Sequence, residues 1–218
     1  MARLRNTLWG AALAATVLLP VTGRAEDPDF GQPMAGEYQL DPGHTRLLFR
    51  VSHLGFSNYT AEFTDVSATL AFDPDQPAAM RLTARVAAAS LETHYPDPAL
   101  DFNGLLTGPD VLDAAQFPEI TFASTEVRPT GATSAEVVGD LTLHGVTQPV
   151  TLAVTYNGGW GDMPMDLGAR IGFSATGAFD RSAFGVGFGA PAPGSTLGVS
   201  DRVEVIIETE FTKARPAN

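Results

Sequence analysis

Apolar and polar residues alternate along most of this chain with the two-residue period of β-strands. Between residues 46 and 54, for example, Phe49, Val51 and His53 share one face, whereas Arg50 and Ser52 share the other. The same alternation recurs over residues 66–72, 80–86, 137–143, 150–156, 171–179 and 203–208. Strands with one apolar face and one polar, solvent-exposed face are typical of antiparallel sheets.

Short turns separate these segments, such as Asp73-Pro74-Asp75 and His144-Gly145-Val146. With the shorter segments 37–40 and 119–127, the pattern gives about eight or nine strands. That number either closes into an antiparallel β-barrel or folds as a sandwich, and no chain is left for a second domain. We predict an all-β fold, a closed antiparallel barrel of about eight strands with one or two short helices.

One region between the strands has a helical pattern. After Pro98, residues Leu100, Phe102, Leu105 and Leu106 follow a helical spacing, and residues 111–115 can add one more turn. A helix inserted among strands can close one end of the barrel, as a plug or a lid. Alternatively, it can be a crossover on the surface. The sequence leaves both readings open.

The N-terminal residues have the pattern of a secretory signal peptide. Arg3 and Arg5 precede an apolar run over residues 8–19, and Gly23 and Ala25 are small residues before a cut after residue 25. The run is short for a membrane span, which takes about 20 residues, and a retained N-terminal anchor is the alternative. We expect residues 1–25 to be a signal peptide, 26–35 a flexible leader, 36–212 the barrel and 213–218 a C-terminal tail.

Charge and cysteine content narrow the classes of function. The 218 residues carry a net charge of −12, which argues against a nucleic-acid partner because phosphate binding needs a basic face. The absence of Cys excludes disulfides, zinc–cysteine sites and a thiol nucleophile. Together with the signal peptide, these features suggest a periplasmic protein. The polar faces of the strands carry charged residues and Thr, whereas the lipid-facing side of a membrane barrel is apolar. We therefore do not expect stable insertion of the barrel in a membrane.

Motifs for catalysis are missing from the sequence. It has no phosphate loop, no G-x-S-x-G and no H-E-x-x-H, and the four His are not spaced as a metal site. We therefore expect no catalytic residues, metal or cofactor. A small-substrate enzyme is the weaker alternative and needs two or more residues from a small set to converge on the lumen. That set is His44, His53, Asp97, Asp101 and Arg181.

Phe is abundant at positions expected to face inward. A packed core explains most of these residues, but an eight-stranded barrel is wide enough to hold one small ligand. Leu105 and Leu106 are candidates to gate one end. For Arg181, a hydrogen bond to strand-end carbonyls is favoured over contact with a ligand head group. The predicted ligand-binding residues are Phe49, Val51, His53, Phe56, Phe63, Leu105, Leu106, Phe122, Phe173, Phe184 and Arg181.

Five segments in order resemble the YceI-like family of periplasmic polyisoprenoid-binding proteins. They are Tyr38-Gln-Leu-Asp41-Pro42-Gly-His44-Thr45, Phe49-Arg-Val-Ser-His53-Leu-Gly55, Phe117-Pro118-Glu-Ile-Thr121-Phe122-Ala-Ser124, Gly139-Asp-Leu141-Thr142-Leu-His-Gly145-Val-Thr147-Gln-Pro149-Val150 and Phe173-Ser-Ala-Thr-Gly177-Ala-Phe-Asp180-Arg181-Ser182-Ala-Phe184-Gly185. The resemblance spans residues 36–212. It implies a lipocalin-like barrel around an apolar tunnel, an isoprenoid or other long-chain lipid as ligand, no catalysis and often a homodimer.

The chain departs from the family pattern at one place. Where the family shows R-D-x-H-L, the sequence has Phe102-Asn103-Gly104-Leu105-Leu106, so the charged cluster is missing there. Cleavage of a signal peptide with three Arg and no acid would also lower the net charge from −12 to −15. Both features favour a neutral quinone or fatty amide over a pyrophosphate.

We therefore predict a periplasmic lipid-binding protein that carries or sequesters an isoprenoid-like or fatty amphiphile in the barrel lumen. The main alternative is a stress-linked structural or interaction protein with a fully packed barrel and no ligand. That alternative requires the lumen to have no continuous cavity, and truncation of Phe49 or Phe173 to Ala would then cost about 3–5 kcal/mol.

Overall fold

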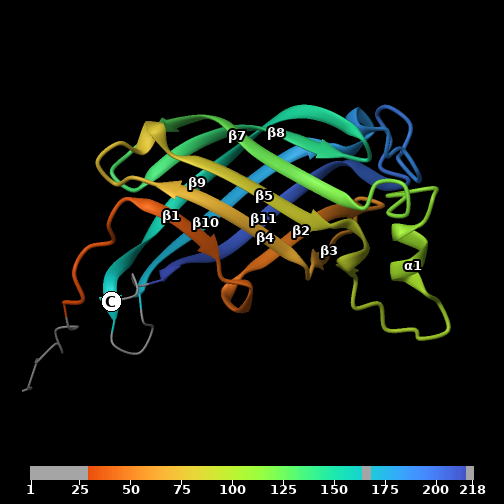
Figure 1. Cartoon of the computed structure of the whole chain (residues 1–218). Coiled ribbons are helices and arrows are strands. Elements are labelled where there is room, and N and C mark those ends of the chain that lie inside the picture. The colour runs from red at the N-terminus through yellow and green to blue at the C-terminus, as the bar shows by residue number, and fades with distance from the viewer. Residues whose placement is uncertain (1–28, 164–167, 215–218) are drawn as a thin grey trace, which may run out of the picture.

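The structure of the chain, a computed structural model, describes residues 29–163 and 168–214 (Figure 1). The strands are β1 (Gly36–Leu40), β2 (Arg46–His53), β3 (Ser57–Phe63), β4 (Val66–Phe72), β5 (Arg81–Ala87), β6 (Leu91–Glu92), β7 (Glu119–Pro129), β8 (Ser134–Leu143), β9 (Val146–Met163), β10 (Gly168–Asp180) and β11 (Val199–Ala214). The helical elements are α1 (Phe102–Thr107) and the 3-10 turns η1 (Pro42–His44), η2 (Pro77–Ala79), η3 (Ala88–Ser90) and η4 (Arg181–Phe184). The all-β prediction is confirmed.

The strand segments combine into eight long antiparallel strands, three of which are bent. β1 and β2 form the first bent strand, because both pair with β11. β3 and β4 form the second, since β3 pairs with β2 and β4 pairs with β1. β5 and β6 form the third, since β5 pairs with β4 and β6 pairs with β3. The fold is therefore the closed eight-stranded barrel that the alternation predicts.

Sequence neighbours are also neighbours in the barrel wall. From the third bent strand the ladder continues through β7, β8, β9, β10 and β11, and β11 returns to the first bent strand. At this seam the pairs Gln39–Thr212 and Leu40–Phe211 join β1 to β11, and β2 pairs with β11 further along. Each of the eight strands thus has a hydrogen-bonded neighbour on both sides, which removes the exposed edges of an open sheet.

The bends have local causes in the sequence. Pro42 in η1 has no N–H to give to a ladder, so the first strand cannot continue straight through it. At the second and third bends the backbone bonds cross between the strands: Thr64 N donates to Ser90 O at 3.1 Å, and Ala87 N donates to Asp65 O at 3.0 Å. The second and third bends thus hold each other in place.

Two clusters of buried side chains pack the barrel away from its middle. The first joins β1, β4, β10 and β11, and the second joins β8, β9 and η4. The first consists of Tyr38, Leu70, Phe72, Ala169, Ile171 and Phe211, and the second of Leu143, Val150, Leu152 and Phe184.

The predicted short helix is present as α1. Asp101 begins it by accepting a hydrogen bond from Gly104 N at 2.8 Å, and Gly108 and Pro109 follow its last residue. Residues 111–115 form hydrogen-bonded turns instead of a further helical turn. Among the described residues, no helix is both long and apolar enough to cross a membrane.

The residues expected to form a leader are bound to the barrel where the structure describes them. Gly161 N donates to Gly31 O at 2.9 Å, and Asp162 N donates to Phe30 O at 3.0 Å. The rings of Phe30 and Trp160 lie edge to face with their centroids 6.3 Å apart. The predicted signal peptide, residues 1–25, lies outside the described residues.

Candidate ligand-binding site

A cavity of about 720 Å³ occupies the interior of the barrel. All eight long strands contribute side chains to its wall, as do α1 and the segment after η4. Small side chains at inward positions, including Ala61, Ala68, Ala84 and Ala175, leave the space that larger residues would fill. The fully packed barrel of the alternative reading is therefore wrong, because it requires a lumen without a continuous cavity.

The cavity reaches the surface at both ends of the barrel. Leu105 on α1 and Phe188 after η4 line the cavity and are also exposed, which marks an opening at the end of the barrel with α1. At the opposite end, Pro74 in the β4–β5 turn and Thr133 in the β7–β8 turn are both exposed and lining. One cavity thus runs between the two ends of the barrel, and we call it the channel.

Hydrogen bonds to the protein already occupy several of the polar groups in the wall. Thr45 Oγ1 donates to Asp41 O at 2.8 Å. Leu82 N donates to Ser124 Oγ at 2.8 Å. The Tyr59 hydroxyl donates to Thr93 O at 3.0 Å. The wall therefore presents mainly apolar surface, which favours an apolar occupant.

Most of the predicted ligand-binding residues lie in the cavity wall. The nine that line it are Phe49, Val51, His53, Phe63, Leu105, Leu106, Phe122, Phe173 and Arg181. The placement of Leu105 and Leu106 also shows that α1 covers one end of the cavity and is more than a surface crossover. Contact of these residues with a ligand stays a prediction.

Two of the predicted residues do not line the cavity, and their placement corrects the prediction. Phe56 lies in the turn between β2 and β3, where Leu54 and Gly55 have positive φ, so the alternation breaks and the ring points to solvent. Phe184 lies in η4 and is buried in the second cluster, with its ring 5.2 Å from that of Phe179. Phe184 is thus a packing residue.

The sequence reading missed other parts of the wall. β3 was not recognised as a strand, although Tyr59, Ala61 and Phe63 alternate along it and all face the lumen. The sequence predicts Phe102 in the helix but does not place it in the site. It lines the cavity, and its ring lies 6.0 Å from that of Tyr59 and 4.8 Å from that of Tyr95.

Arg181 is buried beside the lumen and binds backbone, as the sequence favours. Its Nε donates to Ser200 O at 3.0 Å and its Nη2 to Val199 O at 2.9 Å. Its Nη1 donates to Val186 O at 3.0 Å and to Phe188 O at 2.8 Å. Burial lowers the pKa of the guanidinium from its ordinary value, and Asp201 acts in the opposite direction. Four carbonyl partners leave Arg181 little capacity for a ligand head group.

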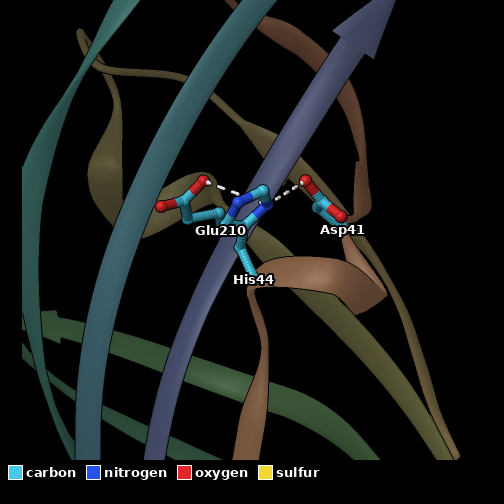
Figure 2. A group of neighbouring side chains, drawn as sticks. All are labelled: Asp41, His44 and Glu210. Atoms are coloured by element: carbon cyan, nitrogen blue, oxygen red, sulfur yellow. Dashed lines mark hydrogen bonds and ion pairs between the residues drawn. The ribbon is translucent and has the colours of Figure 1, made fainter.

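Asp41, His44 and Glu210 form a cluster of possible metal ligands at the barrel seam (Figure 2). His44 Nδ1 lies 2.8 Å from Asp41 Oδ2 and 4.0 Å from Glu210 Oε2. Arg170 Nη1 also donates to Asp41 Oδ2 at 2.7 Å, and it donates to Glu210 Oε2. A guanidinium already neutralises these carboxylates and repels a second cation, so the group fits a structural ion network better than a metal site.

This network shifts the pKa of Asp41. The hydrogen bond with His44 and then that with Arg170 lower the pKa of the carboxyl to about 2, from an ordinary value of 3.8. Because Arg170 lies on β10, Glu210 on β11 and Asp41 directly after β1, the network ties together the elements that close the barrel.

The residues required for a small-substrate enzyme do not converge. His53 and Arg181 line the cavity, but the donors of Arg181 are held by carbonyls. Asp97 Oδ1 accepts from Ala99 N at 3.0 Å in a turn, Asp101 caps α1, and His44 lies at the seam. These contacts support local structural roles.

A closed eight-stranded antiparallel barrel around an apolar channel is a lipocalin-like architecture suited to binding an elongated apolar molecule. The model of the YceI-like domain matches residues 38–211 of this chain. The chain belongs to the YceI-like family.

Curated relatives and solved structures agree with this assignment. UPF0312 proteins of Pseudomonas savastanoi pv. phaseolicola and Pseudomonas putida are 37% and 36% identical to the chain, covering 72% and 85% of it and 79% and 91% of their own lengths. Burkholderia cenocepacia BcnA matches with a TM-score of 0.65 at 26% identity, over 78% of this chain and 98% of BcnA. A polyisoprenoid-binding domain from Saccharophagus degradans shares the fold, with a TM-score of 0.54 at 16% identity over 80% of this chain and 97% of that domain.

Arg181→Lys tests the structural role of the guanidinium. The single ammonium of Lys cannot donate to four carbonyls as the forked guanidinium of Arg does. We therefore expect the free energy of unfolding to fall by about 2–5 kcal/mol. Denaturant titration measures this loss, and the exposed Arg202→Lys serves as the matched control. Unchanged stability combined with weaker lipid binding would instead assign Arg181 to the ligand.

Asp41→Asn tests the ion network through pH. A carboxyl with a lowered pKa adds stability above its unfolded pKa of 3.8, and this stability is lost as the pH falls toward about 2. We expect this group to account for about 1–2 kcal/mol of the acid-induced loss of unfolding free energy, which Asp41→Asn should not show. Denaturation at several pH values measures it, with Asp97→Asn as control. An equally steep pH dependence in Asp41→Asn would contradict the account.

Proposed function

We propose that the protein binds one long-chain, isoprenoid-like lipid in the barrel lumen and carries or sequesters it in the periplasm, without catalysing a reaction. The observation that carries this proposal is the continuous apolar channel. Its volume of about 720 Å³ is within the usual range of ligand pockets, about 300–1,000 Å³. The signal-peptide pattern and the absence of Cys support the periplasmic location.

The size of the lumen favours an occupied state. An apolar wall that faces an empty or water-filled lumen lacks the van der Waals contacts that an apolar occupant would supply. Water is a poor occupant because it needs polar partners, and several polar groups of this wall are already bonded. An apolar tail restores the missing contacts.

The expected driving force is transfer of the tail from water to the dry lumen. Each buried CH₂ contributes about 0.8 kcal/mol, so ten of them give about 8 kcal/mol before the cost of lost tail and rigid-body freedom. Affinity should therefore rise with chain length until the channel is full. The same fold in the Saccharophagus degradans domain, which is described as polyisoprenoid-binding, supports the proposal of such a ligand.

The charged groups at the lumen favour an uncharged head group. Arg81 and Arg181 are the Lys or Arg residues that line the described cavity, and both donate to backbone carbonyls. Arg81 Nη1 donates to Ala78 O at 3.2 Å and to Met80 O at 2.7 Å. A neutral quinone needs no cation, whereas a pyrophosphate buried beside Arg181 would find the donors of that guanidinium already bonded to carbonyls, and Arg81 is exposed at the start of β5.

Lipid analysis combined with a channel-blocking variant tests the function. Organic extraction of freshly purified protein and mass spectrometry should recover a long-chain apolar lipid. Ala84 faces the lumen, so Ala84→Phe should weaken binding of a long-chain quinone at least tenfold, whereas Ala153→Phe on the exposed outer face should not. No extracted lipid together with no quinone binding would overturn the proposal.

Head-group selectivity is tested by ligands that share one isoprenoid chain. A neutral quinone should bind at least tenfold more tightly than the pyrophosphate of the same chain length, and the difference should shrink as salt screens the acidic protein. Fluorescence quenching or calorimetry measures both affinities. Equal or tighter binding of the pyrophosphate would show that a cation at the lumen is free after all.

A further inference from the structure

Large apolar side chains are exposed around the opening of the channel next to α1. Four of them define what we call the apolar collar: Phe56, Leu105, Phe188 and Leu197. Their exposed fractions are 86%, 45%, 57% and 78%. Single exposed apolar residues are common on proteins, but a group around an opening is typical of an interaction surface.

The collar residues come from three segments that meet at this opening. The turn that carries Phe56 is bonded to the segment after η4, because Leu54 N donates to Gly198 O at 2.8 Å. Phe188 lies in the same segment, and Val199 N donates to Gly189 O at 2.9 Å. Leu105 and Phe188 both line the channel. Figure 1 shows α1 and the segment between β10 and β11 at one end of the barrel.

The charges of these segments narrow the choice of partner. No residue from Ser182 to Ser200 carries a charge, in a chain that is 17% charged, and the turn at residues 54–56 is also uncharged. Residues 93–117, which include α1, contain four Asp and no Lys or Arg. An acidic rim repels an anionic lipid surface, whereas the uncharged apolar segments fit a surface without net charge.

We propose that the apolar collar docks on the surface of a neutral, zwitterionic lipid bilayer, so that a tail passes between membrane and channel without crossing water. This inference rests on the proposed function. The aromatic and aliphatic collar residues enter the boundary between head groups and acyl chains, where such side chains are stabilised. The channel opening then faces the apolar layer directly. The same contact is shallow and reversible, because the segments lack the Lys and Arg that anchor proteins to anionic membranes.

A second copy of this chain bound to the apolar collar would block ligand exchange, unlike a bilayer. It would cover the opening through which the ligand enters and leaves at this end. The bilayer surface has no such drawback, since contact and ligand exchange then take place in one encounter. Self-association through the collar is therefore an outcome that the experiment must distinguish.

The test compares flotation of the mature full-length protein with phosphatidylcholine vesicles. Wild-type protein should float with the vesicles. The double variant Phe56→Ser, Leu197→Ser should partition at least tenfold less, and Met34→Ser is the matched control. Met34 is 69% exposed and lies just before β1, at the opposite end of the barrel, so its substitution should leave flotation unchanged. Adding phosphatidylglycerol to the vesicles should weaken binding of the wild type.

Two further measurements separate docking from ligand binding. Loaded from detergent micelles, the double variant should bind a long-chain quinone with wild-type affinity, but it should take the quinone up from vesicles at least tenfold more slowly. Absence of flotation, equal flotation of all variants, or a requirement for anionic lipid would overturn the docking proposal. A dimer in light scattering that the double variant loses would also overturn it, by showing that the collar binds a second copy. Failure of every variant to bind quinone from micelles would overturn the proposed function instead.

Discussion

The hydrogen-bonded closure of the sheet is the constraint on which the rest of this structure depends. Because each of the eight long strands is paired on both sides, the wall holds its shape through backbone bonds and does not need a filled interior. The two buried clusters and the ion network at the seam stabilise the ends of the wall. Without closure, the sheet would collapse onto its apolar face and the channel would disappear.

Side-chain size then decides where the interior stays open. The inward Ala residues on β3, β4, β5 and β10 leave room along the channel. At Gly139 the absence of a side chain lets Phe122 pack against the backbone, since a Cβ there would lie 2.3 Å from Phe122 Cζ. The large residues, such as Phe49 and Phe63, with ring centroids 5.6 Å apart, line the wall between these gaps. The lumen is therefore shaped by small residues as much as by aromatic ones.

The sequence predicted the wall well, because period-two alternation reports directly which side of a strand faces inward. The segments that were misjudged are those where this period breaks. Phe56 lies in the even-numbered register of Arg50 and Ser52, not in that of Phe49 and Val51, and Leu54 and Gly55 turn the chain just before it, so its side chain lies outside the lumen. Phe184 belongs to a 3-10 turn, where alternation has no meaning. The alternation of Tyr59, Ala61 and Phe63 does predict β3, whereas the bend at residues 64–65 that joins β3 to β4 depends on contacts between strands that the sequence does not encode locally.

The most direct test of an open lumen with an apolar occupant is an experimental structure of the protein purified from cells without added ligand. The account predicts continuous, elongated density along the channel between Leu105 and Pro74, bounded by side chains in the positions described above. An interior closed by repacked Phe and Leu side chains, with no space for a hydrocarbon tail, would contradict it.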